Sequence, residues 1–160
     1  MLIGVVSDTH AQMEFTRRAI RMLESLDVEL VVHCGDIGST EIVTLFRQWP
    51  THFVFGNVDS DRAALRQAIA AAGHTCHERF GELELAGRRI AFLHGDDTAL
   101  LHQTSTNGRW DLVCYGHTHQ AKEHRSGETL LLNPGALYRA HPHTFAVVKL
   151  PELETTTIVV

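Results

Sequence analysis

Two histidines separated by one residue, His117 and His119, follow the apolar run at residues 112–115. Side chains at positions i and i+2 of an extended segment point to the same side, so these imidazoles can converge on one point. Imidazole nitrogens are common ligands of transition metals. By itself the pair also fits an ordinary surface turn, so a metal site needs further donors from elsewhere in the chain.

Four other apolar runs end in the same way, with a carboxylate, amide or imidazole shortly after the last apolar residue. In open α/β sheets, ligands bind in the crevice outside the carboxyl ends of the strands. Glycines beside these donors, such as Gly35 and Gly116, let the backbone turn sharply. The sequence therefore predicts one metal centre built from Asp8, His10, Asp36, Asn57, His94, His117 and His119.

These donor types restrict the metal and the number of ions. Oxygen and imidazole donors without a thiolate suit Mn²⁺, Fe, Co²⁺, Ni²⁺ or Zn²⁺, and we expect manganese. Seven donors are too many for one such ion, so we expect two divalent ions per chain with Asp36 as the bridge. The first ion would be held by Asp8, His10, Asp36 and His119. The second would be held by Asp36, Asn57, His94 and His117.

The charge of such a centre favours an anionic substrate. Two divalent ions bring a charge of +4, Asp8 and Asp36 subtract two, and a bridging hydroxide subtracts one. The remaining charge of +1 matches a phosphodiester. Paired metal ions also stabilise the entering and leaving oxygens of an in-line displacement. The donor set therefore predicts hydrolysis of a small phosphate ester.

The elements that position these donors alternate between β-branched runs and segments with helical periodicity, which is typical of an α/β fold. Helices are expected from Phe15 to Leu26, from Ser39 to Trp49, over residues 62–72 and over residues 98–105. Strands are expected at residues 2–7, 30–34, 52–55, 82–85, 88–93, 112–115, 121–124, 129–132, 144–150 and 155–160. The later strands read mostly as antiparallel hairpins. We therefore expect two sheets packed face to face with helices outside.

Composition excludes several other classes of protein. The chain has 160 residues, which fits a single domain over residues 1–160. Its formal charge of −5 argues against non-specific binding to nucleic acid. The first apolar run is too short for a signal peptide or a membrane span, so we expect a cytoplasmic protein.

Cys34, Cys76 and Cys114 are expected to be buried and unpaired. The edge strands at 82–85 and 155–160 could pair between protomers, and the oligomeric state stays open.

Five motifs in chain order resemble those of the calcineurin-like metallophosphoesterases. They are Asp8-Thr9-His10, Gly35-Asp36, Gly56-Asn57-Val58-Asp59, His94-Gly95 and Gly116-His117-Thr118-His119. The short length and the Asn133-Pro134-Gly135 turn are most similar to the small YfcE-type phosphodiesterases, which are relatives of the retromer scaffold subunit. The resemblance implies a four-layer α/β/β/α sandwich with two mixed sheets. It also implies hydrolysis of phosphodiesters by a hydroxide that bridges two ions.

Two positions depart from the family pattern. Val58 stands where many members have a histidine that protonates the leaving group, and Asp96 stands where related small members have another histidine. We assign catalytic roles to Asp36 and Asn57. Asp59 or Asp96 could replace the missing histidine as the proton donor if burial or a neighbouring carboxylate raises its pKa, and the alternative for each is a helix cap or a solvated loop acid. The substrate is expected to contact Asn57, His94 and Arg139.

Two alternatives to a phosphodiesterase stay open. A phosphomonoesterase would use the same mechanism with a pocket suited to one more negative charge. A non-catalytic scaffold, as in the retromer relative, would not need the seven donors. Of the other histidines, His33 is predicted to be a hydrogen-bonded core residue. His74 and His77 are predicted to lie in a polar loop over residues 74–77.

Overall fold

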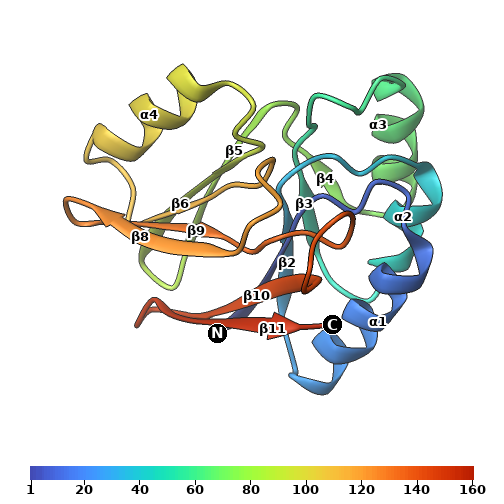
Figure 1. Ribbon diagram of the computed structural model, residues 1–160, viewed down its shortest axis with the longest axis horizontal. Helices are drawn as coiled ribbons and strands as arrows, with labels where there is room; N and C mark the ends of the chain where they lie inside the picture. Colours follow the sequence, from blue (N-terminus) through green and yellow to red (C-terminus); the bar gives the residue numbers. More distant parts are fainter.

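Two β-sheets pack face to face, and helices cover their outer faces (Figure 1). The computed structural model describes all residues from Met1 to Val160. The first sheet has the strand order β11-β10-β1-β2-β3-β4. Its strands are β1 (Leu2–Val6), β2 (Leu30–His33), β3 (Thr51–Phe53), β4 (Thr75–Cys76), β10 (Thr144–Lys149) and β11 (Glu154–Val159). The predicted α/β fold class is confirmed.

The second sheet has the strand order β5-β6-β7-β9-β8. Its strands are β5 (Phe80–Leu85), β6 (Arg88–Leu93), β7 (Leu112–Cys114), β8 (Lys122–Ser126) and β9 (Thr129–Asn133). The helices are α1 (Met13–Ser25), α2 (Thr40–Leu45), α3 (Arg62–Ala71) and α4 (Thr98–Thr106). Figure 1 shows α1, α2 and α3 beside the first sheet and α4 beside the second. None of these helices combines the length and apolar character needed to cross a bilayer.

Side chains alternate between two apolar layers along the central strands. Val31 of β2 packs under the helices, whereas the next residue, Val32, packs between the two sheets. Successive side chains of a strand point to opposite faces, so a strand covered on both sides must be apolar throughout. Each fully buried aliphatic side chain contributes about 1.5–3 kcal/mol of hydrophobic stabilisation. The valine-rich runs therefore form the middle of the sandwich.

Both sheets are mixed, although the sequence suggested parallel pairing mainly in the first half. β6, β7 and β9 pair in parallel in the second sheet. The hairpins β8–β9 and β10–β11 are antiparallel, and β10 also pairs antiparallel with β1. Pairing between strands far apart in the chain has no local signal, which is why periodicity does not predict it.

Three of the differences from the predicted elements have a clear physical cause. α2 ends at Leu45 and not at Trp49, because Phe46 leaves the helix and its N–H bonds to the Val43 carbonyl. β3 ends at Phe53, and the N–H of Phe55 instead bonds to the Glu78 carbonyl. Residues 74–77 were predicted as a loop, yet Thr75–Cys76 forms β4 by pairing with β3. A segment of two residues is too short to show the alternation of apolar and polar side chains by which a strand is predicted.

The three cysteines are unpaired, as expected. Cys34 and Cys114 are buried, whereas Cys76, in β4, is only half-buried. Burial raises the pKa of the Cys114 thiol to about 12. The pKa of Cys34 is also raised, mainly by burial. Both thiols are therefore neutral core groups.

Candidate metal centre

The loops that follow β1, β2, β3, β6 and β7 meet at one edge of the sandwich. They carry the seven donors predicted from the sequence, which we call the donor cluster: Asp8, His10, Asp36, Asn57, His94, His117 and His119. Two groups within it are close enough to hold a metal ion: Asp8 with His10 and His119, and Asp8 with Asp36 and His94. In each group the ligand atoms lie within 4.8 Å of one another.

Asp36 lies between a histidine of each predicted ion site. Its Oδ2 is 3.4 Å from His10 Nε2 and 3.2 Å from His94 Nε2. Asn57 approaches the same imidazole, because its Oδ1 is 3.1 Å from His94 Nε2. An oxygen placed between two imidazoles in this way can bridge two cations.

Asp8 organises the other side of the donor cluster. Its Oδ1 is 3.2 Å from His119 Nε2 and 3.7 Å from His10 Nε2. Its Oδ2 accepts hydrogen bonds from the Ser7 hydroxyl at 2.6 Å and from the His117 backbone N–H at 3.0 Å. The His117 ring packs against His94, with 5.1 Å between ring centroids. His117 therefore adjoins the cluster, although neither group of converging ligand atoms includes its side chain.

The backbone of the donor cluster is unusual. Left-handed φ angles are rare for residues other than glycine and are unfavourable unless the surroundings enforce them. Five of the seven donors have such angles: Asp8 (54°), His10 (43°), Asp36 (54°), His117 (70°) and His119 (58°). Strained residues of this kind concentrate at functional sites, and here they aim the donors at one point.

A glycine makes room for His94. A Cβ on Gly35, which has a φ of +92°, would lie 2.8 Å from His94 Nδ1. That nitrogen is 2.8 Å from the Cys34 carbonyl oxygen, which can only accept a hydrogen bond. His94 Nδ1 therefore carries the proton, and the lone pair of Nε2 faces Asp36 and Asn57.

This tautomer fits a bound cation. Without one, the Nε2 lone pair of a neutral His94 would face the lone pairs of the Asp36 carboxylate. Burial lowers the pKa of His94, but Asp36 and Asp8 outweigh it and raise the pKa, which favours a positive charge at this position. In addition, Asp8 Oδ1 and His10 Nε2 are buried atoms with no hydrogen-bond partner. Buried polar atoms almost always have a partner, and a metal ion between them would supply it. The residues present therefore fit divalent ions.

The electrostatics of the aspartates point the same way. Burial alone raises the pKa of Asp8, but His10, His119, His94 and Ser7 outweigh it and hold the pKa well below its usual range. For Asp36, burial is likewise outweighed by His94 and the Val58 N–H, and the pKa is lowered. Both aspartates are therefore ionised at neutral pH, as metal ligands must be.

His33 supports the cluster from below, which agrees with its prediction as a hydrogen-bonded core residue. The Gly35 N–H donates to His33 Nδ1 at 3.3 Å, so Nε2 holds the proton and donates to Thr9 Oγ1 at 3.1 Å. The Thr9 hydroxyl then donates to the Ile37 carbonyl at 3.0 Å. This series of hydrogen bonds joins the loop after β1 to the loop after β2.

We predict that His33 makes the stability of the metal-free protein depend on pH. Burial lowers the pKa of His33 to about 3, below the 6.5 of an exposed imidazole. Between these values the unfolded state binds the extra proton, so the free energy of unfolding falls as pH decreases, by about 1.4 kcal/mol per pH unit at most. Urea denaturation from pH 6 to 4 should show this slope reduced in His33→Gln but unchanged in His102→Gln, an exposed control. Equal slopes in all three proteins would contradict it.

The two candidate proton donors have different surroundings. Asp59 is buried, and its oxygens accept the N–H groups of Gly38 at 3.0 Å and Gly56 at 2.8 Å. Burial raises the pKa of Asp59, and these two hydrogen bonds oppose the rise. Asp96 is partly exposed and pairs with Arg79 at 3.3 Å. Asp59 thus braces the loops after β2 and β3, and the role of either residue as the acid stays a prediction.

Sequence reasoning missed two residues that position the cluster. The Asn133 amide donates to the Gly116 carbonyl at 2.8 Å and to Thr118 Oγ1 at 3.1 Å, which holds the histidine loop. Tyr138 packs on His10 with 4.7 Å between ring centroids. Arg139, predicted to contact substrate, lies with its guanidinium carbon 5.1 Å from the centroid of the Tyr138 ring. The Asn133-Pro134-Gly135 motif signalled a turn, but no sequence signal indicated Tyr138.

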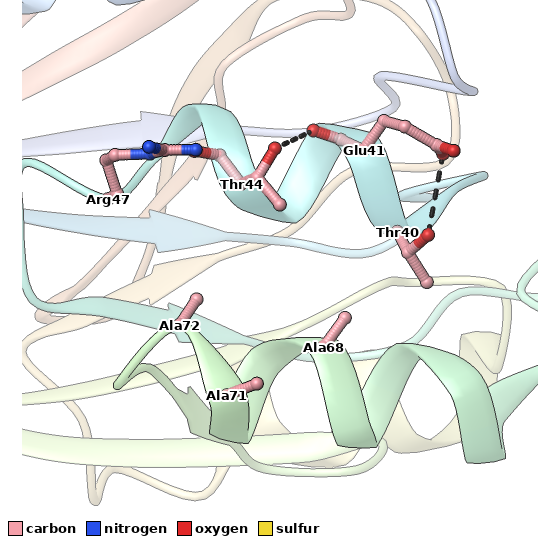
Figure 2. A pocket seen from close by; sticks show the side chains of 7 residues that line it. All are labelled: Thr40, Glu41, Thr44, Arg47, Ala68, Ala71 and Ala72. Carbon is pink, nitrogen blue, oxygen red and sulfur yellow. Dashed lines mark hydrogen bonds between the residues drawn. The ribbon is translucent and has the colours of Figure 1, made fainter.

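A separate groove of about 390 Å³ runs between α2 and α3 (Figure 2). Its lining is Thr40, Glu41, Thr44, Arg47, Ala68, Ala71 and Ala72. Figure 2 shows Ala68 and Ala72 pointing toward α2, which carries the polar side chains of the groove. None of the seven donors lies in this groove, so it plays no part in the metal centre.

The sequence is similar to those of known phosphoesterases. Residues 1–153 match the family model described as "Calcineurin-like phosphoesterase superfamily domain". A phosphodiesterase of Methanocaldococcus jannaschii is 30% identical over 84% of this chain and 83% of its own length. A probable metallophosphoesterase of Methanothermobacter thermautotrophicus is 33% identical over 85% of this chain and 77% of its own length.

Solved structures show the same fold. A structure described as a novel archaeal phosphodiesterase has a TM-score of 0.93 and 28% identity, with all of both chains covered. A phosphoesterase of E. coli, YfcE, has a TM-score of 0.69, 17% identity and 99% coverage of both chains. Vps29 of Entamoeba histolytica, with zinc, has a TM-score of 0.74 and 18% identity over 98% of this chain and 90% of its own. The last two likenesses concern the fold alone. The family match and the archaeal relatives confirm that this chain is a phosphoesterase that belongs to the calcineurin-like superfamily.

Proposed function

We propose that this protein hydrolyses phosphodiesters with the help of two divalent ions held by the donor cluster. The observation that carries the proposal is the position of Asp36, whose Oδ2 lies within 3.4 Å of imidazoles from both predicted ion sites. The preference for diesters is supported by the relative named a phosphodiesterase at 30% identity. When bound, the ions would neutralise charge on the phosphoryl oxygens and lower the pKa of the attacking water.

The chain's own residues orient the substrate beside these ions. Asn57 is exposed and has its amide oxygen directed at His94, which leaves its NH₂ group to donate to a phosphoryl oxygen. Arg139 is exposed and can donate to an oxygen elsewhere on the substrate. The oxygen and imidazole donors support manganese as the native ion. The three unpaired cysteines support a reducing, cytoplasmic location.

Metal analysis followed by parallel assays tests the proposal. The purified protein should contain about two divalent ions per chain when Mn²⁺ is supplied. It should then cleave bis(4-nitrophenyl) phosphate faster than 4-nitrophenyl phosphate. Faster cleavage of the monoester would favour a phosphomonoesterase. Bound metal without cleavage of either ester would favour the non-catalytic scaffold.

We predict that turnover depends strongly on the leaving group, because Val58 cannot donate a proton. Val58 is 43% exposed beside the cluster, and its backbone N–H donates to Asp36 Oδ1 at 3.0 Å. Val58→His keeps this N–H and adds an imidazole, so kcat on an alkyl phosphodiester should rise by about tenfold or more. The aryl diester, which needs little protonation, should change much less. Asp59→Asn and Asp96→Asn, assayed alongside, decide whether either carboxyl is the acid. If neither variant slows the alkyl diester, neither residue is the acid.

A further inference from the structure

A cavity of about 440 Å³ opens beside His119, between the histidine loop and the loop before β10. Its nine lining residues include no aspartate or glutamate: Thr118, His119, Gln120, Ala121, Arg139, Ala140, His141, Pro142 and Thr144. Arg139 forms no ion pair with any residue of the chain. The cavity therefore combines one arginine whose charge is unpaired with hydrogen-bonding side chains and has no carboxylate in its wall.

Arg139 is tied to the donor cluster through aromatic packing. Its guanidinium carbon lies 5.1 Å from the centroid of the Tyr138 ring, and that ring lies 4.7 Å from the His10 ring. Stacking on a tyrosine limits the rotamers of an arginine and leaves its N–H groups free to bind oxygens. The positive charge is thus held at the wall of the cavity, on the ring that packs against His10.

A second cavity, of about 290 Å³, adjoins the other half of the donor cluster at Val58 and Asp59. Its wall contains Glu41, Asp59 and Asp61 and no lysine, arginine or histidine. The two cavities share no lining residue. An anionic group would be repelled from the acidic cavity and attracted to the cavity beside Arg139, because exposed charges act over about 10 Å.

We infer that the substrate is an asymmetric phosphodiester that carries a second phosphate on one ester arm. This arm occupies the cavity beside His119, where Arg139 binds the second phosphate, and the uncharged arm lies toward Val58. Arginine is favoured for this role because its planar group can donate two parallel hydrogen bonds to phosphate oxygens. The inference rests on the proposed phosphodiesterase function and adds the charge of the substrate to it.

Two matched esters test the inference. Thymidine 5′-(4-nitrophenyl phosphate) has an uncharged nucleoside arm, and its 3′-phosphorylated analogue carries the second phosphate. With Mn²⁺ present, the wild-type protein should show a kcat/KM at least about tenfold higher for the phosphorylated ester, mainly through KM, which corresponds to about 1.4 kcal/mol. Arg139→Gln should bring this ratio close to one. Arg109→Gln is the matched control, because Arg109 also lies 5.1 Å from an aromatic ring, that of Trp110, far along the chain.

Binding supplies a second readout that does not depend on turnover. Calorimetry should show that thymidine 3′,5′-bisphosphate binds about tenfold more tightly than thymidine 5′-phosphate, and that Arg139→Gln removes the difference. Cleavage of both esters with equal kcat/KM, or equal binding of the two nucleotides, overturns the inference and leaves the phosphodiesterase proposal standing. If neither ester is cleaved but the bisphosphate still binds more tightly, the result contradicts the proposed phosphodiesterase function. The binding site for a second phosphate beside Arg139 is then still supported.

Discussion

Replacement of Asp36 by asparagine is expected to lower kcat on an aryl phosphodiester by about 10³-fold. The carboxylate lies between His10 and His94 and is the only ligand that the predicted division assigns to both ions, although the two groups of converging ligand atoms share Asp8. Asparagine keeps the size and one oxygen, but it removes the negative charge that holds two cations close together. The variant should therefore retain fewer than two ions per chain, measured by elemental analysis after dialysis.

A matched control separates charge from backbone strain. Asp27 is exposed and has the same φ of 54° as Asp36. Asp27→Asn should fold, bind metal and turn over substrate like the wild type, because asparagine tolerates left-handed φ angles. If Asp36→Asn also kept two ions and full activity, Asp36 would not be the bridge and the two-ion proposal would have to be abandoned.

Gly56→Ala is expected to weaken metal binding by about 100-fold, although Gly56 itself is no ligand. A Cβ at this position would lie 2.6 Å from the Asp36 backbone nitrogen and closer still to Asp36 Oδ1. The methyl group must therefore displace Asp36, the proposed bridging ligand. Calorimetric titration with Mn²⁺ measures the loss of metal affinity directly. Circular dichroism checks that the variant is folded.

The control for this variant is Gly73→Asn, which also replaces a glycine that follows an apolar segment. Gly73 has a φ of +75°, and no atom lies within 4 Å of the position of an added Cβ. Asparagine tolerates this conformation, so metal affinity should stay within twofold of the wild type. Unchanged affinity in Gly56→Ala would show that Asp36 has room to move and that its placement does not limit metal binding.

The sequence was sufficient for the fold class, the family and the residues that gather at one edge. Apolar runs, helical periodicity and glycines are local signals, and they record which segments become strands and where each strand ends. Asp8, Asp36 and His94 follow three of these ends. Because the carboxyl ends of parallel strands share one edge of a sheet, chain order alone predicts that these donors converge.

Only the tertiary structure decided how each donor is used. The Cys34 carbonyl fixes the proton of His94, and the backbone N–H groups of Gly38 and Gly56 hold Asp59 as a brace between loops. β4 exists only because β3 offers it hydrogen bonds, and two residues carry no period that would reveal it. Arg139 and Tyr138 reach the donor cluster from a loop that precedes β10. The contacts of His94 with Cys34, of Asp59 with Gly38 and of Tyr138 with His10 join positions more than 20 residues apart in the chain, so no local pattern records them.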